Sequence, residues 1–386
     1  MLVSDFETLL ESAKKIAVEI SGLHAADVDQ QARFPQESVD AMKAAGLMSA
    51  LVPQHLGGAG LGLLQLGQIC AALGAQCSAS GMVLAMHYSQ LACLSRHCDG
   101  HPEVEAYLRD LVKHQYLLAS MTSEQGTFGA TRTSICAVHV EGGTYMLAKD
   151  ATTGSYCAQA DAIVITCRRH ADAPASDQVL VLAQKGQYTL EQTSQWDTLG
   201  MRGTCSPGFK IQASGPAWQV LPGAFADSSA ESMVPVSHVL WAALWTGIAH
   251  GALQRAGLAV RAAARKTPGQ VPHTARMLAN AVADLQAARQ MWQMVAQEVD
   301  ALGDARADLH AMNWALKFNS LKIKAAEAAP RLVHQALQIV GIQGYKNDGP
   351  HAVGRHYRDV LSASLMISNE RIQSTSADML LVLKDF

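Results

Sequence analysis

The runs Ala162-Ile-Val-Ile-Thr166 and Gln178-Val-Leu-Val-Leu-Ala183 in the middle of the chain are short and apolar, and Asp, Ser and Pro lie between them. From about residue 116 the apolar residues change from the 3.6-residue period of helices to the two-residue period of strands. Six such segments follow one another without a helical pattern between them, which predicts an antiparallel β-barrel or β-sandwich. The other four segments are 117–121, 135–140, 145–148 and 209–212.

Helical patterns lie on both sides of this β region. Leu9, Ala13 and Ile16 share one face near the N-terminus. Three later segments are longer than ordinary globular helices and predict a bundle of antiparallel helices. These segments are 236–265, 272–301 and 306–341. The chain is therefore predicted to be α+β, with an N-terminal α-helical domain at 1–115, a central β domain at 116–222 and a C-terminal α-helical bundle at 223–386.

The composition favours helices packed on helices. Hydrophobic residues make up 49% of the 386 residues and charged residues only 16%, against about 25% charged residues in an average soluble protein. This hydrophobicity excludes intrinsic disorder, which needs low hydrophobicity and high net charge. A net charge of −3 disfavours nucleic acid as a partner, since no excess of basic residues exists to neutralise phosphates. The shortage of polar surface predicts contacts between subunits.

The sequence predicts a cytoplasmic protein without a membrane span. Residues Met1–Glu7 lack the basic segment and apolar run of a signal peptide, and no run of eighteen apolar residues is free of charge. The eight cysteines form no C-x-x-C pair. Buried free thiols in a reducing compartment are therefore expected.

Self-contained catalytic motifs are missing from the sequence. The glycine run Gly57–Gly62 does not match G-x-G-x-x-G and follows a helical pattern, so it does not predict a dinucleotide fold. The histidines lack the spacing of metal ligands, and no metal site is expected. Two polar loops remain, Ser120–Gly126 and Ala151–Ser155. They could hydrogen-bond the edge of a planar polar ring, but these residues alone favour ordinary Ser/Thr turns.

Five short motifs appear in the order of a known family. Together they resemble the acyl-CoA dehydrogenase family of flavoproteins, and the resemblance covers nearly the whole chain. The motifs are Val52-Pro-Gln-His-Leu-Gly-Gly-Ala-Gly-Leu61, Leu199-Gly-Met-Arg-Gly-Thr204, Thr246-Gly-Ile-Ala-His-Gly251, Gln338-Ile-Val-Gly-Ile-Gln-Gly-Tyr345 and Tyr357-Arg-Asp359.

The resemblance implies FAD bound between the β domain and the C-terminal helices, completed by a neighbouring subunit of a homodimer or homotetramer. Thr153 matches the threonine that hydrogen-bonds near flavin N5, the hydride acceptor. Ser123 matches the ring-lining threonine of the family's T-E loop. The further residues implied to bind the cofactor are Met121, Thr122, Ser155 and Asn369, together with Arg265, Gln338 and Gly341, of which the last three would reach the partner's FAD.

Departures from the family pattern concern the substrate side. Gly129 stands where a serine usually meets substrate, and Ala151 where an aromatic residue usually covers the flavin. Ile367 occupies the position of the glutamate that removes the substrate α-proton, and the alternative position of that glutamate falls near Ser237. An Ile cannot abstract a proton.

Glu370, three residues from Ile367, is therefore the candidate catalytic residue. The sequence favours the alternative interpretation, in which Glu370 is a solvated residue at the start of the last helix and has no catalytic role.

Three functions follow from the resemblance. The first is α,β-dehydrogenation of an acyl-CoA-type thioester, with hydride transfer to flavin N5 and electrons passed to an electron-transfer protein or another acceptor. The second is a reduced-flavin-dependent monooxygenase of the same fold, which needs no carboxylate base. The third is a flavin-binding paralogue without catalytic activity.

Overall fold

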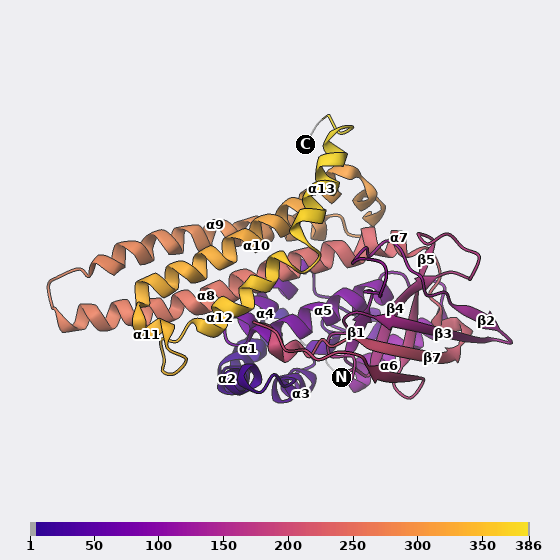
Figure 1. Cartoon of the computed structure of the whole chain (residues 1–386), viewed down its shortest axis with the longest axis horizontal. Coiled ribbons are helices and arrows are strands. Elements are labelled where there is room, and N and C mark those ends of the chain that lie inside the picture. The colour runs from indigo at the N-terminus through magenta and orange to yellow at the C-terminus, as the bar shows by residue number, and fades with distance from the viewer. Residues whose placement is uncertain (1–4, 385–386) are drawn as a thin grey trace.

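The computed structural model describes residues 5–384 of the chain. A helical region, a β region and a second helical region follow one another, with the long helices of the C-terminal bundle extending away from the sheets (Figure 1). The helical–β–helical order predicted from the sequence is confirmed. Residues Met1–Ser4, on which part of the signal-peptide prediction rests, lie outside the described residues.

The N-terminal region packs short amphipathic helices around one almost completely buried helix. Asp5 caps the first helix, where its carboxylate accepts a hydrogen bond from the Thr8 amide at 2.8 Å. Ser78–Ser95 (α5) is buried on nearly every side. The other elements are α1 (Phe6–Ile16), a π-helical turn (Ala17–Ser21), α2 (Gly22–Gln30), α3 (Gln36–Ala44), 3₁₀ turns at Leu47–Ser49 and Gln54–Leu56, α4 (Leu63–Gly74) and α6 (Pro102–His114).

The central region contains two separate sheets, so the sandwich rather than the barrel describes it. One sheet has the strand order β1-β4-β5 and the other has β2-β3-β7-β6. Side chains of β3 alternate between exposed and buried, as expected for a sheet with one solvated face. The strands are β1 (Leu118–Met121), β2 (His139–Glu141), β3 (Thr144–Ala151), β4 (Ala162–Arg168), β5 (Gln178–Gln184), β6 (Tyr188–Gln192) and β7 (Phe209–Pro216).

One pairing differs from the predicted antiparallel arrangement. β1 pairs with β4 in parallel, with Leu118 opposite Ala162 and Met121 opposite Ile165. Parallel neighbours need a long crossover, and here β2 and β3 of the other sheet form it. The run 135–140 is also mostly loop, because regular β2 begins only at His139.

The C-terminal region is built around α8 (Val234–Lys266), a helix of 33 residues that packs against both α4 and α10. Gly247 and Gly251 allow this contact: a Cβ at Gly247 would lie 2.4 Å from the Ala71 carbonyl oxygen, and one at Gly251 2.0 Å from that of Ala75. The remaining elements are α7 (Phe225–Ser228), a π-helical turn (Ser229–Met233), α9 (His273–Ala301), a 3₁₀ turn (Arg306–His310), α10 (Met312–Val340), α11 (Ile342–Tyr345), α12 (Gly354–Val360), a 3₁₀ turn (Leu361–Ser364) and α13 (Asn369–Leu380).

Within residues 5–384, one helical run has the length and apolar composition of a membrane span. It is Phe225–Lys266, and 89% of its most apolar window is buried inside the protein. This burial is what a core helix of a bundle requires.

A buried histidine joins the N-terminal helices to the sheet. His87 on α5 is fully buried, and its Nε2 lies 2.7 Å from the Met48 carbonyl oxygen. Its Nδ1 accepts a hydrogen bond from the Leu118 amide at 3.0 Å, which places the proton of the neutral ring on Nε2. Burial lowers the pKa of His87 to about 4; the Lys43 charge adds to this, whereas the Met48 carbonyl and Asp161 oppose it.

We expect this histidine to make the fold acid-sensitive. Between pH 6.5 and 4 the unfolded chain binds a proton at His87 and the folded chain does not, so the stability that His87 contributes is lost as the pH falls through this range. Urea unfolding measures the free energy of unfolding at pH 7 and at pH 4.5. The decrease between the two should be smaller for His87→Gln than for wild type, by up to about 3 kcal/mol. Equal losses in the two proteins would contradict this prediction.

Candidate functional site

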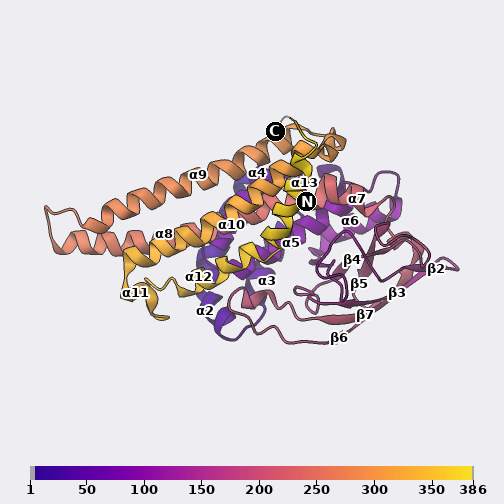
Figure 2. The same cartoon turned by 45° about the horizontal axis from the view of Figure 1, so that its top comes forward.

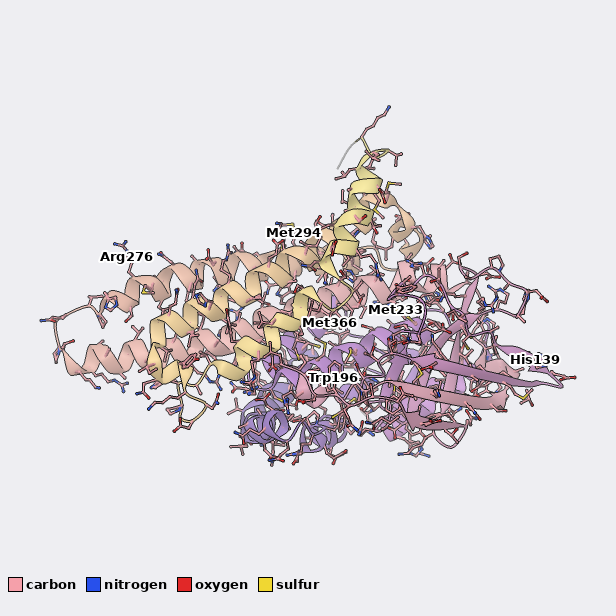
Figure 3. The ribbon with its side chains drawn as sticks, in the orientation of Figure 1. His139, Trp196, Met233, Arg276, Met294 and Met366 are labelled. Carbon is pink, nitrogen blue, oxygen red and sulfur yellow. The ribbon has the colours of Figure 1, made fainter. Side chains whose placement is uncertain are left out.

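A cavity of about 420 Å³ lies where the three regions meet. Residues from α5, the ends of β1 and β3, the start of α8, α10 and α13 line it. Met233, one of the lining residues, lies at this junction between the sheets and the bundle (Figure 3). The cavity is therefore built from segments that are far apart in the sequence.

The two polar loops singled out from the sequence form one wall of this cavity. Ser123 and Thr153 hydrogen-bond each other: the Ser123 hydroxyl donates to the Thr153 carbonyl oxygen at 2.8 Å, and the Thr153 amide donates to the Ser123 Oγ at 3.0 Å. Thr122 and Ser155 also line the cavity. Met121 is fully buried behind this wall. The structure thus brings together four of the residues implied to bind the cofactor.

Buried charges behind the wall fix its position. Lys149 on β3 is buried, and its Nζ donates to the Met121 carbonyl oxygen at 3.2 Å and to that of Thr166 at 2.7 Å. Glu124 lies 3.7 Å from this ammonium and accepts the Cys136 amide at 2.6 Å. Both groups are satisfied by partners away from the cavity, so they hold the loop rather than act in it.

The rest of the cavity lining mixes apolar and polar side chains and contains two unsatisfied polar atoms. Oε1 of Gln90 and Nε1 of Trp241 are buried without a hydrogen-bond partner, and both residues line the cavity. Buried polar groups are normally paired. A flavin ring edge together with a substrate carbonyl would supply the missing donor and acceptor, so the residues present fit a flavin and a polar acyl group.

The position predicted from the sequence for the family's catalytic base lies in the cavity wall. Ile367 lines the cavity and adopts a left-handed conformation with φ +47°; this conformation is strained for a β-branched residue. Ser237 also lines the cavity, but among the described residues no Asp or Glu does. Glu370 is exposed on the first turn of α13, outside the lining.

A buried lysine holds this segment in place. Lys322 of α10 is fully buried; its Nζ donates to Asn369 Oδ1 at 2.6 Å and to the Ile367 carbonyl oxygen at 3.4 Å. Burial lowers the pKa of Lys322 to about 8. Burial, followed by the Lys322 charge, lowers the pKa of the neighbouring His238 to about 3, so this imidazole is neutral. Asn369, expected to contact the cofactor, is thus bonded to Lys322.

The predicted substrate-side positions lie beside the cavity rather than in its lining. Ala151 is buried at the end of β3. Gly129 lies in an exposed loop that Arg371 of α13 holds: the Arg371 guanidinium donates to the Gly129 carbonyl oxygen and to that of Phe128, the latter at 2.6 Å. Arg371 itself lines the cavity.

Three predicted cofactor residues are exposed at the far end of the bundle. Arg265 lies at the end of α8, and Gln338 and Gly341 at the end of α10. These helix ends are remote from the sheets in both views (Figures 1 and 2). Within one chain they do not reach the cavity, so a role in flavin binding requires a second subunit.

Several lining residues carried no motif. Gln90 and Asn319 lie inside helices, and Trp241 was interpreted as a packing residue. Lys322 does not line the cavity but supports its wall, and the sequence could have revealed its burial, because it falls on the same helical face as the buried Phe318 and Ala325. A lone lysine on such a face indicates a buried charge.

Comparison with known proteins agrees with this arrangement. The model of the N-terminal domain of acyl-CoA dehydrogenases matches residues 4–114, and that of the C-terminal domain matches residues 229–373. The chain belongs to the acyl-CoA dehydrogenase family. The resemblance read from the motifs is therefore confirmed, and with it an FAD-dependent oxidoreductase of the class that acts on CH–CH groups.

Relatives in this family differ in what they do. The chain is 25% identical to cyclohex-1-ene-1-carbonyl-CoA dehydrogenase of Geobacter metallireducens, with 96% of each chain covered. It is 27% identical to amino sugar nitrososynthase DnmZ of Streptomyces peucetius, with 88% of this chain and 84% of the relative covered. At this level of identity, the activity has to be argued from the site.

Solved structures of the family share the fold. FMN-bound TdsC from Paenibacillus sp. A11-2 superimposes with a TM-score of 0.83 at 18% identity, covering 97% of both chains. Butyryl-CoA dehydrogenase from Megasphaera elsdenii gives 0.81 at 18% identity, covering 97% of this chain and 98% of that one.

The geometry of the acyl-CoA dehydrogenase-like cavity predicts which side chain matters for flavin binding. Thr153→Ala should weaken flavin binding by about tenfold, because one hydroxyl at the cavity wall is lost. Glu370→Gln should leave it unchanged, since Glu370 lies outside the lining. Flavin fluorescence titration and the visible spectrum measure both effects. Thr189→Ala, at an exposed position on β6, is the control; equal affinities for all four proteins would contradict the role of Thr153.

Proposed function

We propose that this chain catalyses the α,β-dehydrogenation of an acyl thioester such as an acyl-CoA. The observation that carries the proposal is that Ser123 and Thr153, hydrogen-bonded to each other, line one cavity together with apolar side chains, in a chain with both family domains. When bound, FAD supplies the hydride acceptor. The sequence predicted Thr153 as the residue beside that acceptor, and its place in the cavity lining supports this role.

The remaining lining residues suit an acyl chain with a polar head. Met86, Phe225 and Met233 offer apolar surface for the chain. Gln90 Oε1 and Trp241 Nε1 offer one acceptor and one donor in a buried setting, where hydrogen bonds to a thioester are stronger than in water. These groups would orient the substrate and exclude water.

The described lining residues include no base that could remove the α-proton of the substrate. It needs a carboxylate positioned at the substrate and an environment that raises its pKa. Ile367 cannot serve, and we propose Glu370 as the base, reached by a change of about one turn at the start of α13. Glu370→Gln should then abolish dehydrogenation without releasing the flavin.

Anaerobic mixing with a panel of acyl-CoAs tests the reaction directly. The absorbance of the oxidised flavin should bleach with at least one chain length, because hydride transfer reduces the ring. In the Glu370→Gln variant, which lacks the proposed base, Ile367→Glu should accelerate bleaching by about a hundredfold, the typical contribution of a positioned base. Ile367→Gln, with the same length and no charge, should not. Flavin that stays oxidised in wild type and in Ile367→Glu alike would contradict the proposal.

The lining favours a second candidate, a reduced-flavin-dependent monooxygenase. Such a reaction needs no carboxylate, and none of the described lining residues is Asp or Glu. A relative 23% identical to the chain is the dibenzothiophene monooxygenase of Mycolicibacterium goodii. With reduced flavin, dibenzothiophene or indole and ¹⁸O₂, this function predicts one labelled oxygen in the product. If no ¹⁸O enters the aromatic substrate and acyl-CoA bleaches the flavin, the dehydrogenase function is correct and the monooxygenase function is excluded.

We further propose a homodimer or homotetramer in which Arg265, Gln338 and Gly341 contact the FAD of a neighbouring subunit. Their exposure at the far end of the bundle supports this, as guanidinium groups suit phosphate oxygens. Arg265→Gln should weaken FAD binding by about tenfold while Arg109→Gln, on α6, leaves it unchanged. Flavin titration with size-exclusion chromatography measures both. A monomer with full FAD affinity would contradict the shared site.

We also propose that the chain is divided into the three domains 1–115, 116–222 and 223–386. Its electrons would pass to an electron-transfer protein or another acceptor, and the protein would be cytoplasmic. All eight cysteines are free thiols, which agrees with a reducing compartment.

A further inference from the structure

A second cleft, of about 560 Å³, lies farther along α8 and shares no lining residue with the cavity proposed to hold the flavin. It is formed by α2, the loop 198–202, the middle of α8 and the segment 347–358 around α12. Four arginines line it, from three separate parts of the chain: Arg202, Arg255, Arg355 and Arg358. Asp29 is the one carboxylate among the described lining residues.

Two of these arginines are neutralised and two are not. Arg358 pairs with Asp29, and Arg202 with Asp197 at 3.1 Å. Arg255 and Arg355 donate only to backbone carbonyl oxygens, of Gly251 at 3.0 Å and of Gln76 at 2.8 Å, and form no ion pair within the described chain. The cleft therefore carries two half-buried positive charges without an ion-pair partner.

Another buried carboxylate near the cleft, Asp359, interacts with the Arg355 charge but forms no ion pair with Arg255 or Arg355 in the described chain. It accepts the Met201 amide at 2.7 Å and does not line the cleft. Burial raises the pKa of Asp359, although the Arg355 charge opposes this rise. Its bond to the loop 198–202 holds the cleft wall instead.

The two free arginines repel each other. Burial, followed by the charge of Arg355, lowers the pKa of Arg255 to about 10. Burial and the same two arginines keep the pKa of His356 well below its usual value, so the ring is neutral. An anion in the cleft would relieve this repulsion, because each guanidinium would gain an opposite charge.

Two unsatisfied polar groups indicate a ligand that carries a hydrogen-bond donor in addition to a phosphate. His356 is 1% exposed and lines the cleft, yet neither ring nitrogen has a hydrogen-bond partner of good geometry, although the Ala75 backbone lies close enough to raise the pKa of the ring. Oδ1 of Asp29 is also buried without a partner. A phosphate oxygen satisfies an imidazole N–H but cannot donate to a carboxylate, whereas a sugar hydroxyl can.

We propose that this cleft binds a phosphate ester carrying hydroxyl groups, of the nucleotide or sugar-phosphate class. Arg255 and Arg355 would hold the phosphate, since guanidinium forks match its oxygens. His356 would donate to the same group, and Asp29 would accept a hydroxyl. The cleft volume exceeds what one phosphate needs, and Ala26, Leu199 and Pro350 offer apolar surface for the organic part.

Isothermal titration of the FAD-saturated protein tests the site, with ADP, ribose 5-phosphate and inorganic phosphate as probes. ADP or ribose 5-phosphate should bind at one site per chain and at least tenfold more tightly than phosphate. Binding of ADP alone indicates a nucleotide site, and binding of both esters a sugar-phosphate site. Arg255→Gln and Arg355→Gln should each weaken binding by about tenfold or more. Arg276→Gln, whose side chain points away from the bundle on α9 (Figure 3), is the matched control and should change nothing.

The flavin spectrum, recorded in each titration, separates this cleft from the flavin site and reports folding. If a variant loses the flavin, Asn347→Ala in the exposed loop replaces it, and binding should again weaken. No heat with any probe in wild type would overturn the proposal. Unchanged affinity in the arginine or Asn347 variants would also overturn it, as would ADP binding seen only after FAD is removed.

Discussion

The contact between α4 and α8 is the constraint on which the rest of the structure depends. Gly247 and Gly251 leave no side chain between the two backbones, and Gly74 of α4 faces Leu244 in the same way. α8 is thereby fixed against the N-terminal helices along its middle. Its first turns then line the cavity proposed to hold the flavin, and Arg255 in its second half lines the cleft with four arginines, so the position of both depends on this one close approach.

Buried charges determine the shape of the cavity without taking part in it. Lys149 and Glu124 fix the loop after β1, and Lys322 fixes the segment before α13. Buried charges are costly unless they are hydrogen-bonded, so each holds its backbone partners firmly. The sequence predicts that Ile367 stands in this site where the family has its catalytic carboxylate. That predicted replacement is why two kinds of flavin reaction compete for this chain.

Local pattern was sufficient for most of the fold. The 3.6-residue period predicted α8 and α9 nearly to their ends and α10 except for its start at Met312. The two-residue period located β1, β3, β4, β5 and β7, but only the beginning of β2 and not β6. The parallel pairing of β1 with β4 was not predictable, because it depends on a crossover through a second sheet. The polar loops were found as Ser/Thr-rich turns, whereas their contact through Ser123 and Thr153 exists only after folding.

The sequence by itself determined the family and the order of the three regions, and it predicted the flavin loops and a missing base at residue 367, because each of these depends on neighbouring residues along the chain. The tertiary structure decided that Glu370 faces solvent, that Lys322 holds Asn369, and that Arg255 and Arg355 share one cleft. These facts depend on how helices distant in sequence pack together. Burial and charge at such junctions are properties of the packed elements, and no local pattern contains them.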